Sequence, residues 1–331
     1  MKFYKIILIK LILFVFVGIG LTQETAPSLS INQNQVAEAG GVGIISVNLD
    51  AGISDITAIA FSIDYDESVL AYDEAVDAFI CFNETLFTCT LMPPNLLDTD
   101  GELDFVVMSV DSNVSIPSGE ILSLPFLINS STADNTIASV AISVSPSESY
   151  GNNLGASVPR NLATNGFFLV RRTSLDVQFA LQGQTDFEGA IRLRLYDSQG
   201  NLVNEQLPLA SENGLVNMSS ITSGTYQLAV KSDKSLQVVV PIDLTIGSNT
   251  INVGTLMGGD ADNDNRITLQ DFSILTSSFN LGQSDEGYDD RADFNEDNLV
   301  TLADFSLLTS NFNVAGEEPS SNVTTNSVPT N

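Results

Sequence analysis

The sequence predicts a mainly β protein in which two β-sandwiches precede a small α-helical module. Residues 28 to 170 contain many short runs of alternating apolar and polar residues, separated by clusters of Gly, Asp, Asn, Ser and Pro. This is the pattern of half-buried strands joined by turns. The same pattern returns in residues 172 to 257, and at Gly258 it gives way to two acidic loops, each followed by a run of helical period.

Length and composition restrict the function as well as the fold. The 331 residues are enough for two or three domains with cores of their own. With 41 acidic and 12 basic residues, the formal net charge is -29, which excludes nucleic acid as a partner and favours cations. The chain has no His, so His-based triads and His-ligated zinc are excluded, and no Trp, the strongest stacking surface for sugars.

Residues 1 to 22 are predicted to be a secretory signal peptide. Lys2, Lys5 and Lys10 are followed by an apolar run from Leu11 to Leu21, which is the layout of such a peptide. The alternative is an uncleaved membrane anchor, and either reading places the rest of the chain outside the membrane. No hydrophobic stretch follows that could span a membrane, so we expect a secreted or cell-surface protein without a transmembrane segment after cleavage.

The first unit, residues 28 to 170, is expected to be a β-sandwich or a jelly roll. Its predicted strands have the sequences GIISVNL, IAFSIDY, LDFVVMSV, ILSLPFLI and ASVAISVSP. Cys81 and Cys89 lie close together in this region, and in an exported chain an even number of cysteines favours a disulfide. Two unpaired thiols are the alternative.

The second sandwich, residues 172 to 257, is predicted to be smaller. The segment RLRLYDSQGNLVNEQL reads as two strands around a turn, and GTYQLAVKS reads as another strand. We place the boundary with the first sandwich at Arg171 and Arg172.

The two acidic loops have the spacing of a calcium-binding loop. Calcium takes six to eight oxygen ligands, and a twelve-residue loop supplies them from positions 1, 3, 5, 7, 9 and 12. In the first loop these positions hold Asp260, Asp262, Asp264, Arg266 through its carbonyl, Thr268 and Asp271. In the second loop they hold Asp293, Asn295, Asp297, Leu299 through its carbonyl, Thr301 and Asp304. We therefore expect two bound Ca²⁺ ions, and the alternative is a pair of solvated acidic turns.

The two loops belong to an internal repeat of 33 residues. Residues 260 to 280 and 293 to 313 are identical at 13 of 21 positions. Position 6 of each loop is Asn, the non-Gly residue that best tolerates the left-handed conformation needed there. Each loop leads into an amphipathic helix, and no helix precedes the first loop. Because several carboxylates converge in each loop, the module is expected to be ordered by calcium.

Loops of this kind, with an Asp at position 12 and no entering helix, resemble a type I dockerin domain, here at residues 258 to 316. The resemblance implies that the module binds two Ca²⁺ ions and docks onto a cohesin domain. It also implies that partner choice depends on loop positions 10 and 11, and that two docking orientations exist because the halves are alike. Those positions are Leu269, Gln270, Leu302 and Ala303. The alternative for the two leucines is that they fill the module's own core.

The two sandwiches also show resemblances. The segments GGVGIISVNLDAGISDITAIAFSIDYDESVL, DGELDFVVMSV and IPSGEILSLPFLINSS resemble a cohesin domain, although the insertion with Cys81, Cys89 and Met92-Pro93-Pro94 departs from that family's pattern. The segments YDSQGNLV and ITSGTYQLAVKSD resemble transthyretin-like or carboxypeptidase-regulatory spacer sandwiches. Residues 317 to 331 are polar and are expected to be disordered.

Together these resemblances imply a non-catalytic adaptor of a cellulosome-like assembly, whose partners carry cohesin or dockerin domains and which can self-associate. One alternative is carbohydrate binding or cell-surface adhesion by the sandwiches, with polysaccharide as a partner and with Tyr65, Tyr72, Phe82 and Tyr150 as stacking rings. Another is a glycosidase with a carboxylate pair, for which Asp64, Asp66 and Glu67 are candidates, but these read more simply as strand-end and turn acids.

Overall fold

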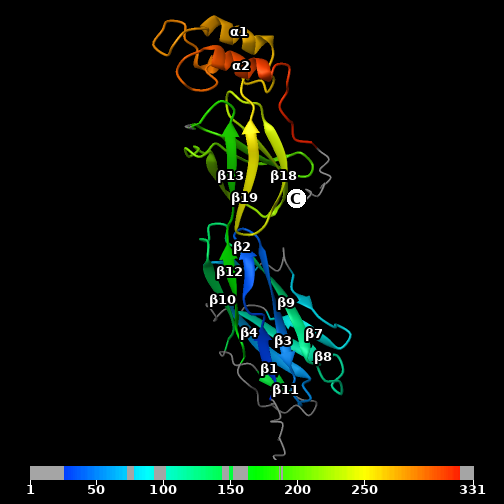
Figure 1. The fold of residues 1–331 in the computed structure, drawn as a ribbon. Helices are drawn as coiled ribbons and strands as arrows, with labels where there is room; N and C mark the ends of the chain where they lie inside the picture. The colour runs from blue at the N-terminus through cyan, green and yellow to red at the C-terminus, as the bar shows by residue number, and fades with distance from the viewer. Residues whose placement is uncertain are drawn as a thin grey trace, which may run out of the picture.

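The structure is a computed structural model that describes residues 26–72, 78–92, 102–143, 149–151, 163–185, 187 and 189–320. The predicted signal peptide lies outside these residues. Figure 1 shows a first sandwich, a second sandwich and a pair of helices arranged in a row along the molecule. The predicted mainly β fold is confirmed, since the described residues form nineteen strands and two α-helices. Neither helix is long and apolar enough to cross a membrane.

The first sandwich consists of two sheets that face each other. One sheet contains β1 (Ser28–Ile31), β3 (Val42–Asp50), β9 (Gly119–Ile128) and β5 (Leu70–Ala71) in that order, and β6 (Ile80–Cys81) also pairs with β9. The other contains β2 (Gln35–Glu38), β12 (Gly166–Arg171), β10 (Thr136–Ile142), β4 (Ala58–Tyr65), β8 (Leu103–Ser109) and β7 (Phe87–Leu91), and β11 (Ser149–Gly151) pairs with β4. The pairs are antiparallel except β2 with β12, which is parallel.

The core of the first sandwich follows from the alternation in its strands. In β3, the side chains of Ile45, Val47 and Leu49 are buried, and the residues between them are more exposed. Phe126 in β9 and Phe168 in β12 lie at the centre of the core with ring centroids 6.4 Å apart. The period of two therefore places one face of each sheet inside, as expected for packed sheets.

A disulfide joins Cys81 and Cys89, whose Cα atoms are 5.7 Å apart. Cys81 belongs to β6, which pairs with the first sheet, and Cys89 belongs to β7 in the second sheet. The bond therefore connects the two sheets. The neighbouring Pro93 and Pro94 lie outside the described residues.

Replacing both cysteines by Ser is expected to lower the free energy of unfolding of the first sandwich by about 2–3 kcal/mol, the value that the chain-entropy model predicts for so short a loop. Urea denaturation with and without a reducing agent measures this change. The reducing agent should destabilise the wild-type chain and leave the Ser variant unchanged. A wild-type chain indifferent to reduction would contradict a stabilising disulfide.

The second sandwich also consists of two sheets. One contains β16 (Leu215–Ile221), β13 (Thr173–Leu181) and β19 (Ser248–Leu256), with β13 and β19 parallel. The other contains β15 (Leu202–Gln206), β14 (Arg192–Tyr196), β17 (Gly224–Lys231) and β18 (Val238–Leu244). A separate core fills the space between them.

Polar contacts join the first sandwich to the second. The backbone N–H of Ser223 donates to Glu38 Oε1 at 2.8 Å, and the Ser223 hydroxyl donates to Glu38 Oε2 at 2.7 Å. The hydroxyl of Thr173, the first residue of β13, also donates to Glu38. Because β13 follows β12 after a single residue, these contacts restrain the short connection.

The helical module contains α1 (Leu269–Ser278), a short 3-10 helix at Asp290–Ala292 and α2 (Leu302–Ser310). Leu275 and Leu308 are fully buried between the helices, and the rings of Phe272 and Phe305 are 6.3 Å apart. Leu236, from the loop between β17 and β18, belongs to the same core and is 3% exposed. The module therefore completes its core with a residue of the second sandwich, which a module of this size needs to bury enough apolar surface.

The residues after α2 differ in part from the expectation of a disordered tail. Residues 317 to 320 lie along the second sandwich (Figure 1). The N–H of Glu317 donates to the Gln237 carbonyl at 2.9 Å, and Ser320 and Gln227 exchange two hydrogen bonds. These bonds order a polar segment that has no apolar pattern of its own. Residues 321 to 331 lie outside the described part of the chain.

Candidate metal centre

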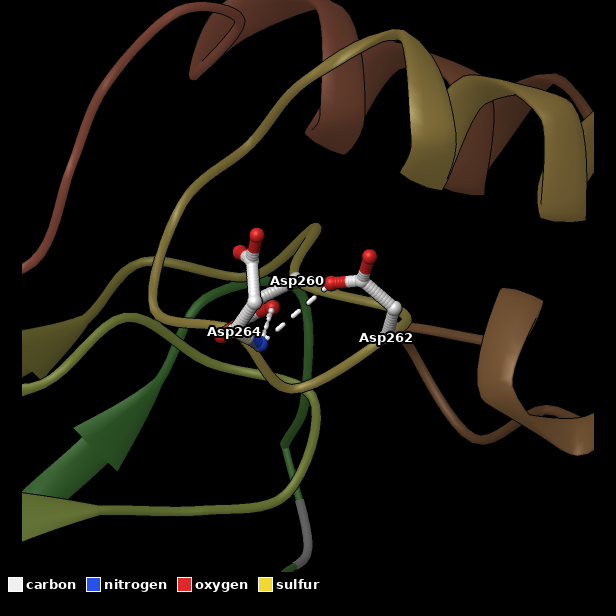
Figure 2. A group of neighbouring side chains, drawn as sticks. All are labelled: Asp260, Asp262 and Asp264. Atoms are coloured by element: carbon white, nitrogen blue, oxygen red, sulfur yellow. Dashed lines mark hydrogen bonds between the residues drawn. The ribbon is translucent and has the colours of Figure 1, made fainter.

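The first acidic loop brings three carboxylates together at the start of the helical module. Figure 2 shows Asp260, Asp262 and Asp264 around one turn of backbone. One carboxylate oxygen from each lies within 4.8 Å of the others. The N–H of Asp264 donates to Asp260 Oδ1 at 3.0 Å and to Asp262 Oδ1 at 3.3 Å, so loop positions 1, 3 and 5 face the same small volume (Figure 2).

Asp271, the twelfth residue, closes the loop. Its Oδ1 accepts hydrogen bonds from the N–H groups of Ala261 at 2.8 Å and Asp262 at 3.2 Å, and its Oδ2 accepts from the N–H of Thr268 at 2.7 Å. The carboxylate is fully buried. It therefore ties the start of the loop to the first turn of α1.

Thr268 and Thr301, predicted as ligands at position 9, are the N-cap residues of the two helices. Each forms a capping box with the Asp three residues later, Asp271 and Asp304 respectively. This capping role was not predicted from the sequence, although Thr-x-x-Asp before an apolar run is close to the usual signal of a helix start. The capping boxes explain why an Asp stands at position 12, since this side chain reaches the backbone of the cap.

The backbone at loop position 6 has the expected conformation. Asn265 has a φ of 67° and Asn298 a φ of 68°. At position 7, the N–H groups of Arg266 and Leu299 donate to the carboxylates of Asp264 and Asp297 at 2.8 and 3.0 Å. The role of their carbonyl groups as ligands stays a prediction.

The second loop repeats this geometry. Asp304 is fully buried and accepts hydrogen bonds from the N–H groups of Phe294, Asn295 and Thr301 at 2.8 to 3.2 Å. The side chain of Asn295 donates to Asp297 Oδ2 at 2.9 Å. In both loops, the twelfth residue therefore anchors the chain segment that carries positions 1 to 3.

The two loops differ in what contacts the carboxylate at position 1. In the first loop, Lys231 Nζ donates to Asp260 Oδ2 at 2.6 Å. In the second loop, the hydroxyl of Tyr288 donates to Asp293 Oδ2 at 2.8 Å. Burial and the hydrogen bond to Asp293 raise the pKa of Tyr288 above its ordinary value, so this donor is neutral. Neither contact was predicted from the sequence.

One buried oxygen of the second loop accepts no hydrogen bond from the part of the chain that the structure describes. This atom is Oδ1 of Asp293, a residue that is 2% exposed. A buried carboxylate oxygen without a partner is costly. A cation bound there would satisfy it.

Negative charge accumulates in the first loop. Burial raises the pKa of the Asp260 carboxyl, and the hydrogen bond from Lys231 opposes this shift. Burial also raises the pKa of the Asp262 carboxyl, and the charges of Asp271, Asp264 and Asp260 add to the effect. A bound cation would remove this repulsion.

The donor set fits calcium, a hard cation that prefers carboxylate and carbonyl oxygens. Asp260, Asp262 and Asp264 lie together in the first loop, and Asp293, Asn295 and Asp297 hold the same positions in the second. The unpaired Oδ1 of Asp293 is the observation that most directly favours a cation ligand at this position.

A separate exposed feature lies beside the loops. Leu269 is 70% exposed and Leu302 is 68% exposed. The alternative that these leucines fill the core of the module is therefore wrong, because Leu275 and Leu308 occupy that core. Gln270 and Ala303 are exposed as well. We call Leu269, Gln270, Leu302 and Ala303 the docking face, after the role that the sequence resemblance predicts for them.

The other candidate residues take part in the first sandwich. The rings of Tyr65 and Tyr72 pack on Phe126, with centroids 4.9 and 6.2 Å away, and Phe82 packs against the core. The side chain of Tyr150 lies outside the described residues. Asp66 accepts hydrogen bonds from the backbone and hydroxyl of Ser68, as a turn residue does. Asp64 and Glu67 are exposed at the end of β4.

Several solved structures align with parts of this chain. No protein-family model matches the sequence, and no curated protein matches it. The sixth cohesin of scaffoldin B from Acetivibrio cellulolyticus, solved with the Cel5 dockerin, aligns with 44% of this chain and 99% of its own at 23% identity and a TM-score of 0.36. The CaCohA2 structure from Clostridium acetobutylicum aligns with 44% of this chain and 92% of its own at 16% identity and a TM-score of 0.35. The major pilin subunit of Bacillus cereus aligns over 69% of both chains at 11% identity and a TM-score of 0.39.

Proposed function

We propose that this chain is a non-catalytic adaptor outside the cell, and that its helical module binds two Ca²⁺ ions and docks onto a partner. In each loop, the residues at positions 1, 3, 5 and 12 hold the ion, with the carbonyls of Arg266 and Leu299 at position 7. The ion supplies positive charge that offsets the converging carboxylates and fixes the loop against its helix. The buried, unpaired Oδ1 of Asp293 carries this proposal.

Docking takes place through the docking face, which is presented on the first turns of α1 and α2. Exposed leucines that are not needed for the core are suited to the centre of a protein interface. The partner is a domain of the cohesin type. Because the first sandwich resembles a cohesin in sequence, it in turn receives dockerin-like modules, including that of a second copy of this chain. Such a contact is heterologous and produces rings or chains of molecules.

The test is a calcium titration of the chain from residue 23 onward by calorimetry, followed by sedimentation velocity with Ca²⁺ and with EDTA. Two ions per chain and an increase in sedimentation coefficient only with Ca²⁺ are expected. Two ions without self-association would direct the search to cohesin domains of other proteins. No binding at millimolar Ca²⁺ would contradict the proposed function.

A further inference from the structure

Lys231 is a buried residue of the second sandwich whose ammonium group lies in the first metal loop. It ends β17, and its Nζ donates to Asp260 Oδ2 at 2.6 Å and to the Ser235 carbonyl at 2.5 Å. The side chains of Lys231 and Asp260 are 8% and 0% exposed. Because a buried charge without a partner is strongly destabilising, each of the two depends on the other.

Lys231 also makes the ligand positions of the two loops alike in charge. Those of the first loop hold four carboxylates, at Asp260, Asp262, Asp264 and Asp271, whereas those of the second hold three, because Asn295 replaces an acid and Glu296 lies between ligand positions. With the ammonium group of Lys231 counted, the ligand positions of the first loop also carry three net negative charges. The internal cation therefore offsets the additional carboxylate at the ligand positions of that loop.

In the part of the chain that the structure describes, no lysine or arginine pairs with a ligand carboxylate of the second loop. Its equivalent carboxylate oxygen, Asp293 Oδ2, accepts from the neutral Tyr288 hydroxyl, and Asp293 Oδ1 is unpaired. Lys234 is near this loop, but its Nζ lies 3.1 Å from the Asp293 carbonyl and 3.5 Å from Glu296 Oε1. It contacts none of the carboxylates that we assign as ligands.

We propose that Lys231 is a built-in counter-cation of the first loop, which holds this loop in shape without calcium and leaves the second loop dependent on the ion. This inference rests on the calcium binding proposed above. It also predicts an order of filling. An ion in the first loop shares Asp260, both of whose oxygens already accept hydrogen bonds, with an ammonium group, whereas Asp293 Oδ1 in the second loop is unpaired. The second loop therefore has the higher affinity.

The first experiment compares the chain from residue 23 onward with its Lys231→Met variant in Ca²⁺ and in EDTA by scanning calorimetry. In EDTA the variant leaves the buried carboxylate of Asp260 without a counter-charge, so the melting temperature of the variant should fall by about 5–10 °C. In Ca²⁺ the bound ion still compensates Asp260, so the fall should be smaller. The stabilisation by calcium is therefore expected to be larger in the variant than in the wild-type chain.

Tyr288→Phe is the matched control, because it removes the donor at the equivalent oxygen of the second loop without changing the charge. Its melting temperatures in Ca²⁺ and EDTA should change by similar amounts. If Ca²⁺ raises the melting temperature of the wild-type chain, and raises that of Lys231→Met by no larger an amount, the inference about Lys231 is wrong but the chain still binds calcium. If calcium does not stabilise the wild-type chain, both proposals are wrong.

Hydrogen–deuterium exchange of the wild-type chain tests the proposed role of Lys231 even if Lys231→Met does not fold in EDTA. Without calcium, the amides of residues 260 to 271 should stay protected while those of residues 293 to 304 exchange. When Ca²⁺ is added, the amides of the second loop should become protected at a lower Ca²⁺ concentration than the one at which exchange in the first loop changes. Equal exchange of the two loops in EDTA would overturn the proposal.

Discussion

Asp293→Asn is expected to remove one of the two calcium ions and to have opposite effects on stability with and without calcium. In EDTA, the wild-type residue is a buried carboxylate with an unpaired oxygen, so removing its charge should raise the melting temperature. In Ca²⁺ the variant loses the stabilisation that the ion provides to the second loop. That stabilisation is about 4 kcal/mol at a calcium concentration 1,000 times the dissociation constant.

The change of sign distinguishes a ligand from a structural residue. A residue that only held the loop together would destabilise the module under both conditions when replaced. Calorimetric titration should give one ion per chain, and thermal unfolding should be followed in both buffers. Glu286→Gln is the control, because it removes the same charge from an exposed position of the module outside the loops, and it should retain two ions. Two ions in Asp293→Asn would contradict the assignment of Asp293.

The sequence predicted the parts of this protein that depend on local pattern. Alternation of period two predicted the mainly β fold, and the repeated spacing of acidic residues predicted both loops and the helices that follow. The left-handed Asn265 and Asn298 were also expected, because few other residues adopt this conformation.

The contacts that make the two loops different could not be predicted, because they come from outside the repeat. Lys231 lies 29 residues before Asp260 and belongs to the second sandwich, not to the helical module. An isolated lysine at the end of a strand normally points into solvent, and nothing in its neighbours distinguishes it. The attachment of residues 317 to 320 was missed for a related reason, since hydrogen bonds between this backbone and the side chains of Gln227 and Gln237 leave no pattern in the sequence.

A double variant, Leu269→Asp with Leu302→Asp, is expected to abolish docking without destabilising the module. Both side chains are largely exposed, so the folded state tolerates a charge at either position. In an interface, each new carboxylate would be buried without a partner, which costs on the order of 3 kcal/mol or about a hundredfold in affinity. Sedimentation velocity with Ca²⁺ measures the loss of docking affinity. If the wild-type chain does not self-associate, its binding to a set of cohesin domains is measured instead.

The single variants test whether both docking orientations remain available. The second sandwich packs against the module through Leu236, and the Asn311 side chain donates to Gln182 at 2.6 Å. These contacts leave Leu269 and Leu302 equally exposed, so either half of the repeat can present its leucine to a partner. Each single variant should then keep one orientation and lose only about half of the association constant. If one single variant alone abolished binding, docking would use one orientation, and the second sandwich or the partner would break the equivalence of the two halves.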